Sequence, residues 1–312
     1  MECTVAFGPL SEADRDAVAA LIHRSLVQWY ESRLRQGHRF GDQAAPFRIF
    51  PDVYEALDPG ETITARASAT GEILGVCFTH ERPTHLAVGI VATAPESAGR
   101  GLAKRMLELA LAQARRLGRP ARLVSSLLNL DSFSLYNRLG FVPGALFQDL
   151  QLAVPAAGLP GPAPAGAESV REARPADATA LADLEFSLQG IRRDKDLAFF
   201  LQPTAGAWRV LMLPGADGAP RGFLVTSTHP SALMIGPGVA ADEAAATALL
   251  WATLDLLRGK SVVFLLPCAA TDVVRAAYTW GARNVELHLA QSTAPVLSAR
   301  GVVFPTFLPE SG

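Results

Sequence analysis

The sequence is poor in cysteine. Among its 312 residues only Cys3, Cys77 and Cys268 are cysteines, which form neither a metal-binding pattern nor an even disulfide set. A reduced, cytoplasmic protein is the simplest interpretation. Cys77 lies in the apolar segment 73–78, where a small core residue is expected rather than a nucleophile.

The chain also lacks an excess of positive charge and any long hydrophobic run. It has 28 Lys and Arg against 30 Asp and Glu, a formal net charge of −2, which argues against a nucleic-acid partner. No apolar run reaches membrane-spanning length, and Met1 to Cys3 lack the features of a signal peptide, so we expect no membrane partner. With 49% hydrophobic residues, the chain can form ample core, and its length suggests two domains.

A proline-rich segment divides the sequence. Residues 153–167 contain four prolines and no hydrophobic period, which is typical of an interdomain linker. The second half then repeats the order of the first: Gly222 opens an apolar strand as Gly75 does, and Gly281 matches Gly140 near the end of the repeat. We interpret this as a tandem duplication, with domains at 1–152 and 168–312. Two unrelated α/β domains are the alternative.

The most informative stretch is the Gly-rich turn Ala98-Gly99-Arg100-Gly101, which follows an apolar strand and opens an amphipathic helix at residues 102–117. Such a turn leaves several backbone N–H groups unpaired beside the positive end of the helix dipole, so it suits a phosphate. The glycines let an anion approach without meeting a Cβ, and Lys104 adds cationic charge. A turn with two glycines also arises for purely steric reasons.

A second motif follows about thirty residues later, with Asn129, Ser132, Tyr136, Gly140 and Phe141 at characteristic spacings. Together with Thr93-Ala94-Pro95 and the Gly-rich turn, it resembles the GNAT superfamily of N-acetyltransferases. The resemblance is clear over residues 62–150. It implies an α/β protein with two GNAT-like α+β domains in tandem, each a mixed, mostly antiparallel sheet flanked by helices.

The resemblance implies acetyl-CoA as co-substrate and no metal. The turn would hold the pyrophosphate, the preceding strand would pair through its backbone with the pantetheine arm, and the second motif would help hold that arm. The implied cofactor-binding residues are Val91, Ala92, Thr93, Ala98, Gly99, Arg100, Gly101, Leu102, Ala103, Lys104, Asn129, Ser132 and Arg138. A solvated helix face is the alternative role for the arginines near 115–119.

The resemblance also implies a catalytic acid. Tyr136 occupies the position of the family's usual general acid, which donates a proton to the departing sulfur; packing of the short helix is the alternative. The family's glutamate base would fall at Ala87, so the base is expected at His85, two residues earlier on the same strand face. His80 and Glu81, expected in the preceding turn, are second choices.

The acceptor is poorly specified. Residues 28–58 carry aromatics and arginines that would suit an amine bearing an acid or a ring, or would simply pack the helices. We therefore expect an acetyl-CoA-dependent N-acetyltransferase acting by direct attack on a primary amine of a small molecule or peptide, as a monomer or homodimer. Because Ala98 replaces the family's usual Gln or Arg and Ala87 its glutamate, a non-catalytic acyl-CoA-binding or scaffolding module is the alternative.

The second copy lacks the chemistry of the first. Its counterpart of the Gly-rich turn, residues 240–246, has no glycine and carries Asp242 and Glu243, which oppose phosphate binding. Ala277 stands at the position that matches Tyr136. The second domain is expected to be structural, with its apolar C-terminal tail lying against one of the domains.

Overall fold

The computed structural model describes residues 4–202, 206–229, 232–295, 299–306 and 308. They form two compact units, one of residues 4–81, 85–123 and 308, the other of residues 82–84 and 124–306 with those gaps. Cys3 and the first three residues lie outside the described residues. In the described part of the chain, no helix is long and apolar enough to cross a membrane.

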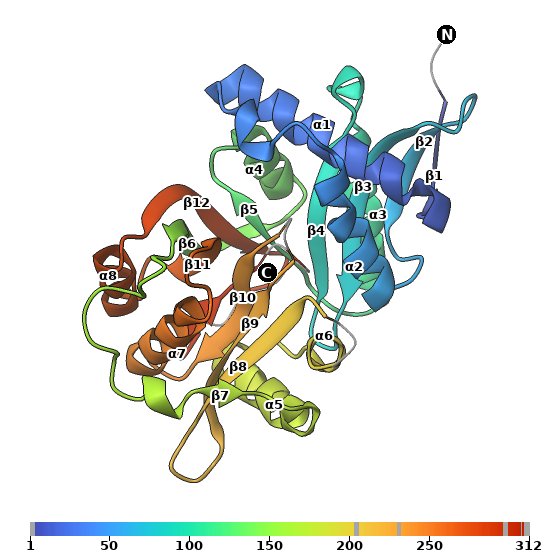
Figure 1. The fold of residues 1–312 in the computed structure, drawn as a ribbon. Helices are drawn as coiled ribbons and strands as arrows, with labels where there is room; N and C mark the ends of the chain where they lie inside the picture. Colours follow the sequence, from blue (N-terminus) through green and yellow to red (C-terminus); the bar gives the residue numbers. More distant parts are fainter. Residues whose placement is uncertain (1–3, 203–205, 230–231, 296–298, 307, 309–312) are drawn as a thin grey trace. The chain divides into compact units, whose positions relative to one another are not determined.

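The first unit is a sheet with helices on both faces. Its strands follow one another in sequence and space, antiparallel except for the last pair. Helices α1 and α2 pass in front of the strands in Figure 1, and α3 lies behind them. The elements are β1 (Val5–Pro9), α1 (Arg15–Leu34), α2 (Ile49–Leu57), β2 (Ile63–Ala67), β3 (Ile73–Glu81), β4 (Leu86–Thr93), α3 (Leu102–Arg116) and the start of β5 (Ala121–Ser126), with short 3-10 turns Glu12–Asp14, Gly37–Phe40, Ala45–Arg48 and Pro95–Ser97.

The pattern of apolar residues explains why strand β3 lies in the core of this unit, between helices α2 and α3. Strand β3 is buried along its whole length up to Glu81, as its continuous apolar run predicts. On one face of β3, Gly75 leaves room for the Met106 side chain of α3. On the other face, Phe78 stacks on Tyr54 of α2, with ring centroids 4.5 Å apart. Cys77 is fully buried, and burial raises the pKa of its thiol to about 12, which suits the expected core residue.

The second unit repeats the element order of the first. Its own elements are α4 (Leu130–Arg138), β6 (Val142–Ala153), β7 (Arg171–Glu172), α5 (Ala178–Gln189), α6 (Asp194–Phe200), β8 (Trp208–Pro214), β9 (Pro220–Ser227), β10 (Met234–Ala240), α7 (Glu243–Asp255), β11 (Ser261–Pro267), α8 (Thr271–Thr279), β12 (Arg283–Ser292) and β13 (Val302–Phe304), with 3-10 turns Ala167–Ser169 and Pro175–Asp177. From β7 to β12 the order β, α, α, β, β, β, α, β, α, β matches that from β1 to β6.

The expected boundary at the proline-rich segment does not coincide with the division between the compact units. Strand β6, which precedes that segment, lies between β11 and β12 and pairs antiparallel with both. The end of β5, from Val124, lies next to β12 in the same unit. The segment itself packs onto this unit through the buried side chains of Val154 and Leu159. The division between the units therefore follows strand pairing, which the local sequence does not encode, and not the change in composition at the proline-rich segment.

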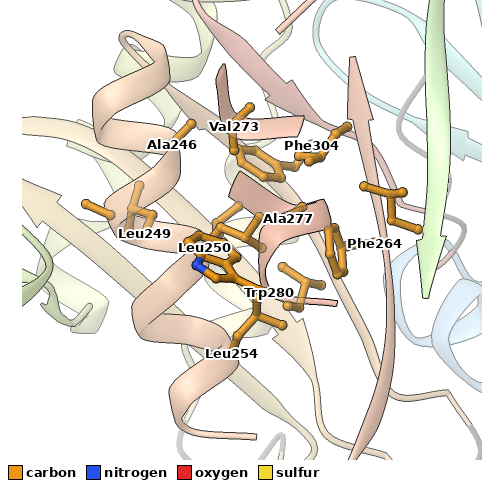
Figure 2. Packing of buried hydrophobic residues seen from close by; sticks show 14 of the residues in the cluster. Ala246, Leu249, Leu250, Leu254, Phe264, Val273, Ala277, Trp280 and Phe304 are labelled. Atoms are coloured by element: carbon orange, nitrogen blue, oxygen red, sulfur yellow. The ribbon is translucent and has the colours of Figure 1, made fainter. Parts of the chain in front are cut away.

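The largest core of the second unit lies beneath α7 and α8. Figure 2 shows Leu250 and Leu254 of α7 packed with Val273 and Ala277 of α8 and with Trp280 just after it. Phe304 of β13 is 1% exposed in the same cluster, so the C-terminal strand belongs to the core. The opposite face of the sheet packs a second cluster against α5 and α6. The apolar tail thus lies where burial is most favourable.

The helix entry at the start of the first unit contains a partly buried ion pair. Asp14 accepts a hydrogen bond from the Ser11 backbone N–H at 2.9 Å, and two from the Arg66 guanidinium at 2.9 and 2.6 Å. These donors favour the carboxylate, so the pKa of Asp14 lies well below its ordinary value, chiefly because of Arg66.

Replacing Asp14 by Asn should make unfolding less sensitive to acid. A carboxyl with a depressed folded-state pKa stabilises the fold above its unfolded pKa of about 4, and this contribution is lost as the pH falls through the folded value. Asp14→Asn should therefore lower the free energy of unfolding by about 1–2 kcal/mol at pH 7 and by much less at pH 2. The control is Asp16→Asn, which removes the 81% exposed partner of Arg48. Urea titrations from pH 2 to 7 that show equal losses for both variants would contradict this.

Candidate functional site

The turn before α3 has the backbone that its glycines predict. After β4 ends, a 3-10 turn leads to Gly99 and Gly101, both at φ +76°, and Gly101 is the N-cap of α3. A Cβ on either glycine would meet no atom within 4 Å, so glycine is required by the left-handed conformation and not by lack of space. The turn faces open space, with Gly99, Arg100 and Gly101 all exposed.

Most backbone donors of this turn have no acceptor. Within the described chain, Ala98 N–H bonds to Pro95 and Arg100 N–H to Ser97, but five other N–H groups receive no partner: those of Gly99, Gly101, Leu102, Ala103 and Lys104. They surround the positive end of a fifteen-residue helix. In the first turn of α3, the exposed side chains of Lys104 and Arg105 lie 3.7 and 3.4 Å from Glu108 oxygens. Together these groups can bind an anion with several oxygens.

Strand β4 presents a free backbone edge beside the turn. It pairs in parallel with β5 only where Leu86 meets Ala121 and Ala87 meets Arg122. Beyond Ala87, no strand of the described ranges pairs with β4 on this side, so the backbones of Val91 to Thr93 are available to a ligand with amide groups. A bulge lies between: Gly89 and Ile90 together oppose Phe78 of β3.

The three candidates for a base lie at the other end of β4. His85 directly precedes the strand and is fully buried. His80 and Glu81, expected in a turn, lie in β3 instead. Glu81 pairs with Arg119 at 2.8 Å. His80 is the cross-strand neighbour of Ala87, is fully buried, and pairs through Nδ1 with the Asp58 carboxylate in a short hydrogen bond.

No sequence motif includes Asp58, which directly follows the last turn of α2. Helix α2 buries Ile49, Val53 and Leu57, and that spacing, together with the aromatic Tyr54, was the available signal for a helix packed on the sheet. The partner of Asp58 lies in another element 22 residues away, and no local pattern reveals such a pair.

The residues of the second motif lie on α4 in the second unit. Asn129 is the N-cap and accepts the Ser132 N–H at 3.0 Å. Tyr136 is 9% exposed and meets Phe141 edge to face, with centroids 5.8 Å apart, while Arg138 is exposed. The N-cap explains locally why an Asn opens this helix and why Ser132 follows three residues later.

The aromatic residues of segment 28–58 contact one another. Tyr30 meets Phe40 edge to face at 4.7 Å, and Phe40 leads to Phe47 at 6.5 Å. Arg39 lies over the Tyr30 ring at 5.3 Å from its centroid. This segment thus packs on itself, and the arginine is already engaged by an aromatic ring.

In the second unit the counterpart of the Gly-rich turn is filled by carboxylates. Asp242 is the N-cap of α7 and accepts the Ala245 N–H at 2.8 Å. Glu243 accepts the N–H groups of Asp272 and Val273 at 2.5 and 3.1 Å, so it caps α8. At the start of α7 the Asp242 carboxylate therefore occupies a donor that a phosphate would need, while Glu243 is engaged at the start of α8.

The counterpart of the free strand edge is also filled. Strand β10 pairs with β11 only at Met234 and Ile235, and then with β13 from Gly238 to Ala240. Its bulge, Gly236–Pro237, opposes Val225 as the bulge of β4 opposes Phe78, 147 residues earlier. A Cβ on Gly236 would lie 2.5 Å from the Pro305 carbonyl oxygen. The C-terminal segment thus covers the second edge.

One comparison with known proteins matches the part of the chain that contains the Gly-rich turn and strand β4. The family model described as Acetyltransferase (GNAT) family matches residues 24–141. No curated protein matches the chain. In the described residues, no group of three or more His, Cys, Asp or Glu side chains could hold a metal ion.

Solved structures share the whole fold at low sequence identity. A Pyrococcus horikoshii protein is 13% identical with a TM-score of 0.73, over 97% of this chain and 92% of that one. A GCN5-related N-acetyltransferase from Sphaerobacter thermophilus is 15% identical with a TM-score of 0.63, over 95% and 98%. A tandem GNAT protein from the clavulanic acid biosynthesis pathway is 16% identical with a TM-score of 0.60, over 94% and 99%.

These matches extend over both halves and agree with the mixed sheet flanked by helices in each. The expected fold, two GNAT-like domains in tandem, is confirmed. The family model covers the strand, the Gly-rich turn and the second motif together. Residues 24–141 therefore match the GNAT family of acetyltransferases, and the chain has the fold of GNAT proteins over both halves.

Proposed function

We propose that this protein is an acetyl-CoA-dependent N-acetyltransferase that acts on a primary amine of a small molecule or peptide. The observation that carries the proposal is the pairing of five unpartnered N–H groups at the start of α3 with the free edge of β4 that leads to them. A pyrophosphate needs the first feature and the amides of a pantetheine arm need the second. Acetyl-CoA supplies the acetyl group as a thioester.

Different groups would bind different parts of acetyl-CoA. The N–H groups from Gly99 to Lys104 would hold the pyrophosphate, with Arg100 and Lys104 balancing its charge. Backbones of Val91, Ala92 and Thr93 would pair with the arm. Ala98 contributes only its backbone here, because it lacks the longer side chain of the family pattern. Asn129, Ser132 and Arg138 complete the proposed binding set.

The reaction needs a neutral amine and a protonated leaving group. We assign the first task to His85, with Glu81 as a second choice: the base takes a proton from the acceptor ammonium, and the amine attacks the thioester carbon. The C–N bond forms, the C–S bond breaks, and Tyr136 donates its phenolic proton to the departing sulfur. The attacking nitrogen loses its extra proton to solvent, and the tyrosinate regains a proton from solvent, so the products are the neutral amide and the free thiol.

The second half is proposed to be a structural partner with a degenerate copy of the site. Asp242 and Glu243 already satisfy helix N-termini there, and β13 already pairs with the edge of β10. Both would have to be displaced before a phosphate or a pantetheine arm could bind. The apolar packing that the unit needs does not depend on either function.

A non-catalytic acyl-CoA-binding module is the second candidate. Ala87 favours it, because the strand position that carries the family's glutamate has a methyl side chain. We favour the enzyme, because two histidines lie near that position, at His80 and His85. A cytoplasmic monomer or homodimer fits either candidate.

Acetyl-CoA should bind once per chain, and Gly101→Asp should abolish binding. A carboxylate would enter the anion site, and an L-residue at φ +76° strains the turn. Gly118→Asp is the matched control, since Gly118 lies past the other end of α3 at φ +64° with nothing within 4 Å. Calorimetry should show one site in the wild type and the control. Two equivalent sites, or binding by Gly101→Asp, would rule out this assignment.

Tyr136→Phe should lower turnover by roughly 10²- to 10⁴-fold with nearly unchanged acetyl-CoA affinity, because it removes the proton donor and keeps the ring. Release of free thiol from acetyl-CoA with a panel of amines measures turnover. Phe141→Leu is the control for lost ring packing, since Phe141 contacts Tyr136. A normal rate in Tyr136→Phe makes this tyrosine a packing residue. Saturable binding without turnover in the wild type would favour the non-catalytic module.

His85→Ala should raise the apparent pKa of the acidic limb of the pH–rate profile or flatten it, because a base near neutrality would be lost. The profile of kcat/KM from pH 5 to 10 measures this. Glu81→Gln, which loses a contact with Arg119, serves as the comparison. If both profiles match the wild type, the proton acceptor is another group or water.

A further inference from the structure

The unpaired edge of β4 ends where β5 joins it at Ala87, and the proposed function places the acyl group of the ligand near that junction. With the pyrophosphate at the start of α3, an arm that pairs with Thr93 to Val91 runs back along β4 toward the bulge at Gly89. The thioester then lies between Val91 and the point where β4 and β5 join, at Ala87 and Arg122. The acyl chain must fit into what remains of that space.

One side chain takes up the space that the bulge leaves. A Cβ on Gly89 would lie 2.2 Å from the Tyr54 hydroxyl oxygen and 2.7 Å from its Cζ, so the phenol occupies the volume where a side chain would be. A residue with a Cβ would not fit at position 89, because the phenol of Tyr54 fills that volume. Tyr54 is fully buried, and so is Ala87. Near the strand junction, the face of β4 toward α2 is therefore covered by the tyrosine.

Two ring contacts and a hydrogen bond between neighbouring residues hold the phenol in this position. Its ring stacks on Phe78 at 4.5 Å with an interplanar angle of 15°, and it meets the His80 ring edge to face at 6.5 Å. One helical turn after Tyr54, Asp58 bonds His80 Nδ1 and so ties the end of α2 to β3. A buried hydrogen-bonded pair of this kind fixes geometry, because separating the partners would leave unsatisfied polar groups in the interior.

We propose that Tyr54 limits the acyl chain of the bound thioester to acetyl and excludes butyryl and longer chains, and that the Asp58–His80 pair positions it. This inference rests on the proposed function for the location of the thioester, and it adds the substrate range of that site. Each methylene beyond acetyl would meet the phenol over Gly89 or the strand junction beyond it. A rigid, tightly packed end discriminates between chain lengths more strongly than a loose one.

The test compares the affinities of CoA, acetyl-CoA and butyryl-CoA by calorimetry, which needs no acceptor amine. The wild type should bind butyryl-CoA about 10-fold or more weakly than acetyl-CoA. Tyr54→Ala should reduce that ratio by about 10-fold, because the volume of a phenol ring becomes available. Tyr54→Phe is the matched control: it keeps the ring whose Cζ lies 2.7 Å from the Gly89 position, so it should keep the discrimination.

Two further variants guard against loss of folding. Tyr54→Leu fills part of the cavity that Tyr54→Ala creates, and its ratio should fall between those of the alanine variant and the wild type. Gly89→Ala should lower the melting temperature of the wild type, and Tyr54→Ala should largely reverse that loss in the double variant. A double variant that shows the sum of the two separate losses would deny the contact between these residues.

The positioning pair is tested by Asp58→Asn, which should shift the acyl ratio toward that of Tyr54→Ala while CoA affinity stays unchanged. The matched control is Asp149→Asn, which alters the other buried Asp and His couple, Asp149 and His288 at 3.7 Å, in the second unit. That variant should leave the ratio unchanged. If Asp58→Asn and Asp149→Asn gave the same ratio of acetyl-CoA to butyryl-CoA affinity, Asp58 would not position Tyr54.

The outcomes separate this inference from the function on which it rests. If CoA binds but acetyl- and butyryl-CoA bind equally well to the wild type, Tyr54 does not restrict the chain. The same holds if Tyr54→Ala, folded by its melting curve, keeps the wild-type ratio. If CoA itself does not bind, the proposed coenzyme site is wrong and the inference falls with it.

Discussion

The early end of the pairing between β4 and β5 is the constraint on which the first site depends. The two strands share backbone hydrogen bonds only at Leu86–Ala87 and Ala121–Arg122, and beyond them one edge of β4 has no strand partner in the described chain. Unpaired backbone groups are costly when they are shielded from water. A ligand with amide groups would satisfy them, and further N–H groups without a partner among the described residues lie at the start of α3.

In the second unit, segments of the chain itself satisfy the corresponding unpaired backbone groups. Strand β10 also leaves β11 after two residues, and β13 then takes the vacant edge. Carboxylates of Asp242 and Glu243 take the donors at the helix starts. The same backbone plan therefore leaves an unpaired strand edge in the first unit, whereas in the second unit a strand and side chains fill the corresponding place. Phe304 and Val302, both buried, add apolar burial to the second solution.

Much of the first site could be predicted because its signals are local. Gly99 and Gly101 adopt the left-handed backbone that no other residue adopts easily, and the helix that follows has a regular apolar period. The fold and family followed from motifs at set spacings, and the comparisons confirmed both. The placement of β6 between β11 and β12 was not predictable, since strand order depends on pairing between segments more than a hundred residues apart. For the same reason the proline-rich segment predicted a boundary that the strands cross.

The least predictable feature is the pair of Asp58 and His80, and its physics explains why it matters. Neither residue belongs to a motif, and each alone is an ordinary member of a helix end or a strand. In the fold the two side chains meet, and His80 is fully buried. Their contact adds little stability compared with apolar packing, but it fixes how α2 packs on β3. Tyr54 shares that helix turn, and its phenol reaches the one position of β4 without a side chain near the strand junction. A glycine, a tyrosine and a buried Asp–His hydrogen bond thus depend on one another, because a change in any of them alters the packing beside the junction of β4 and β5.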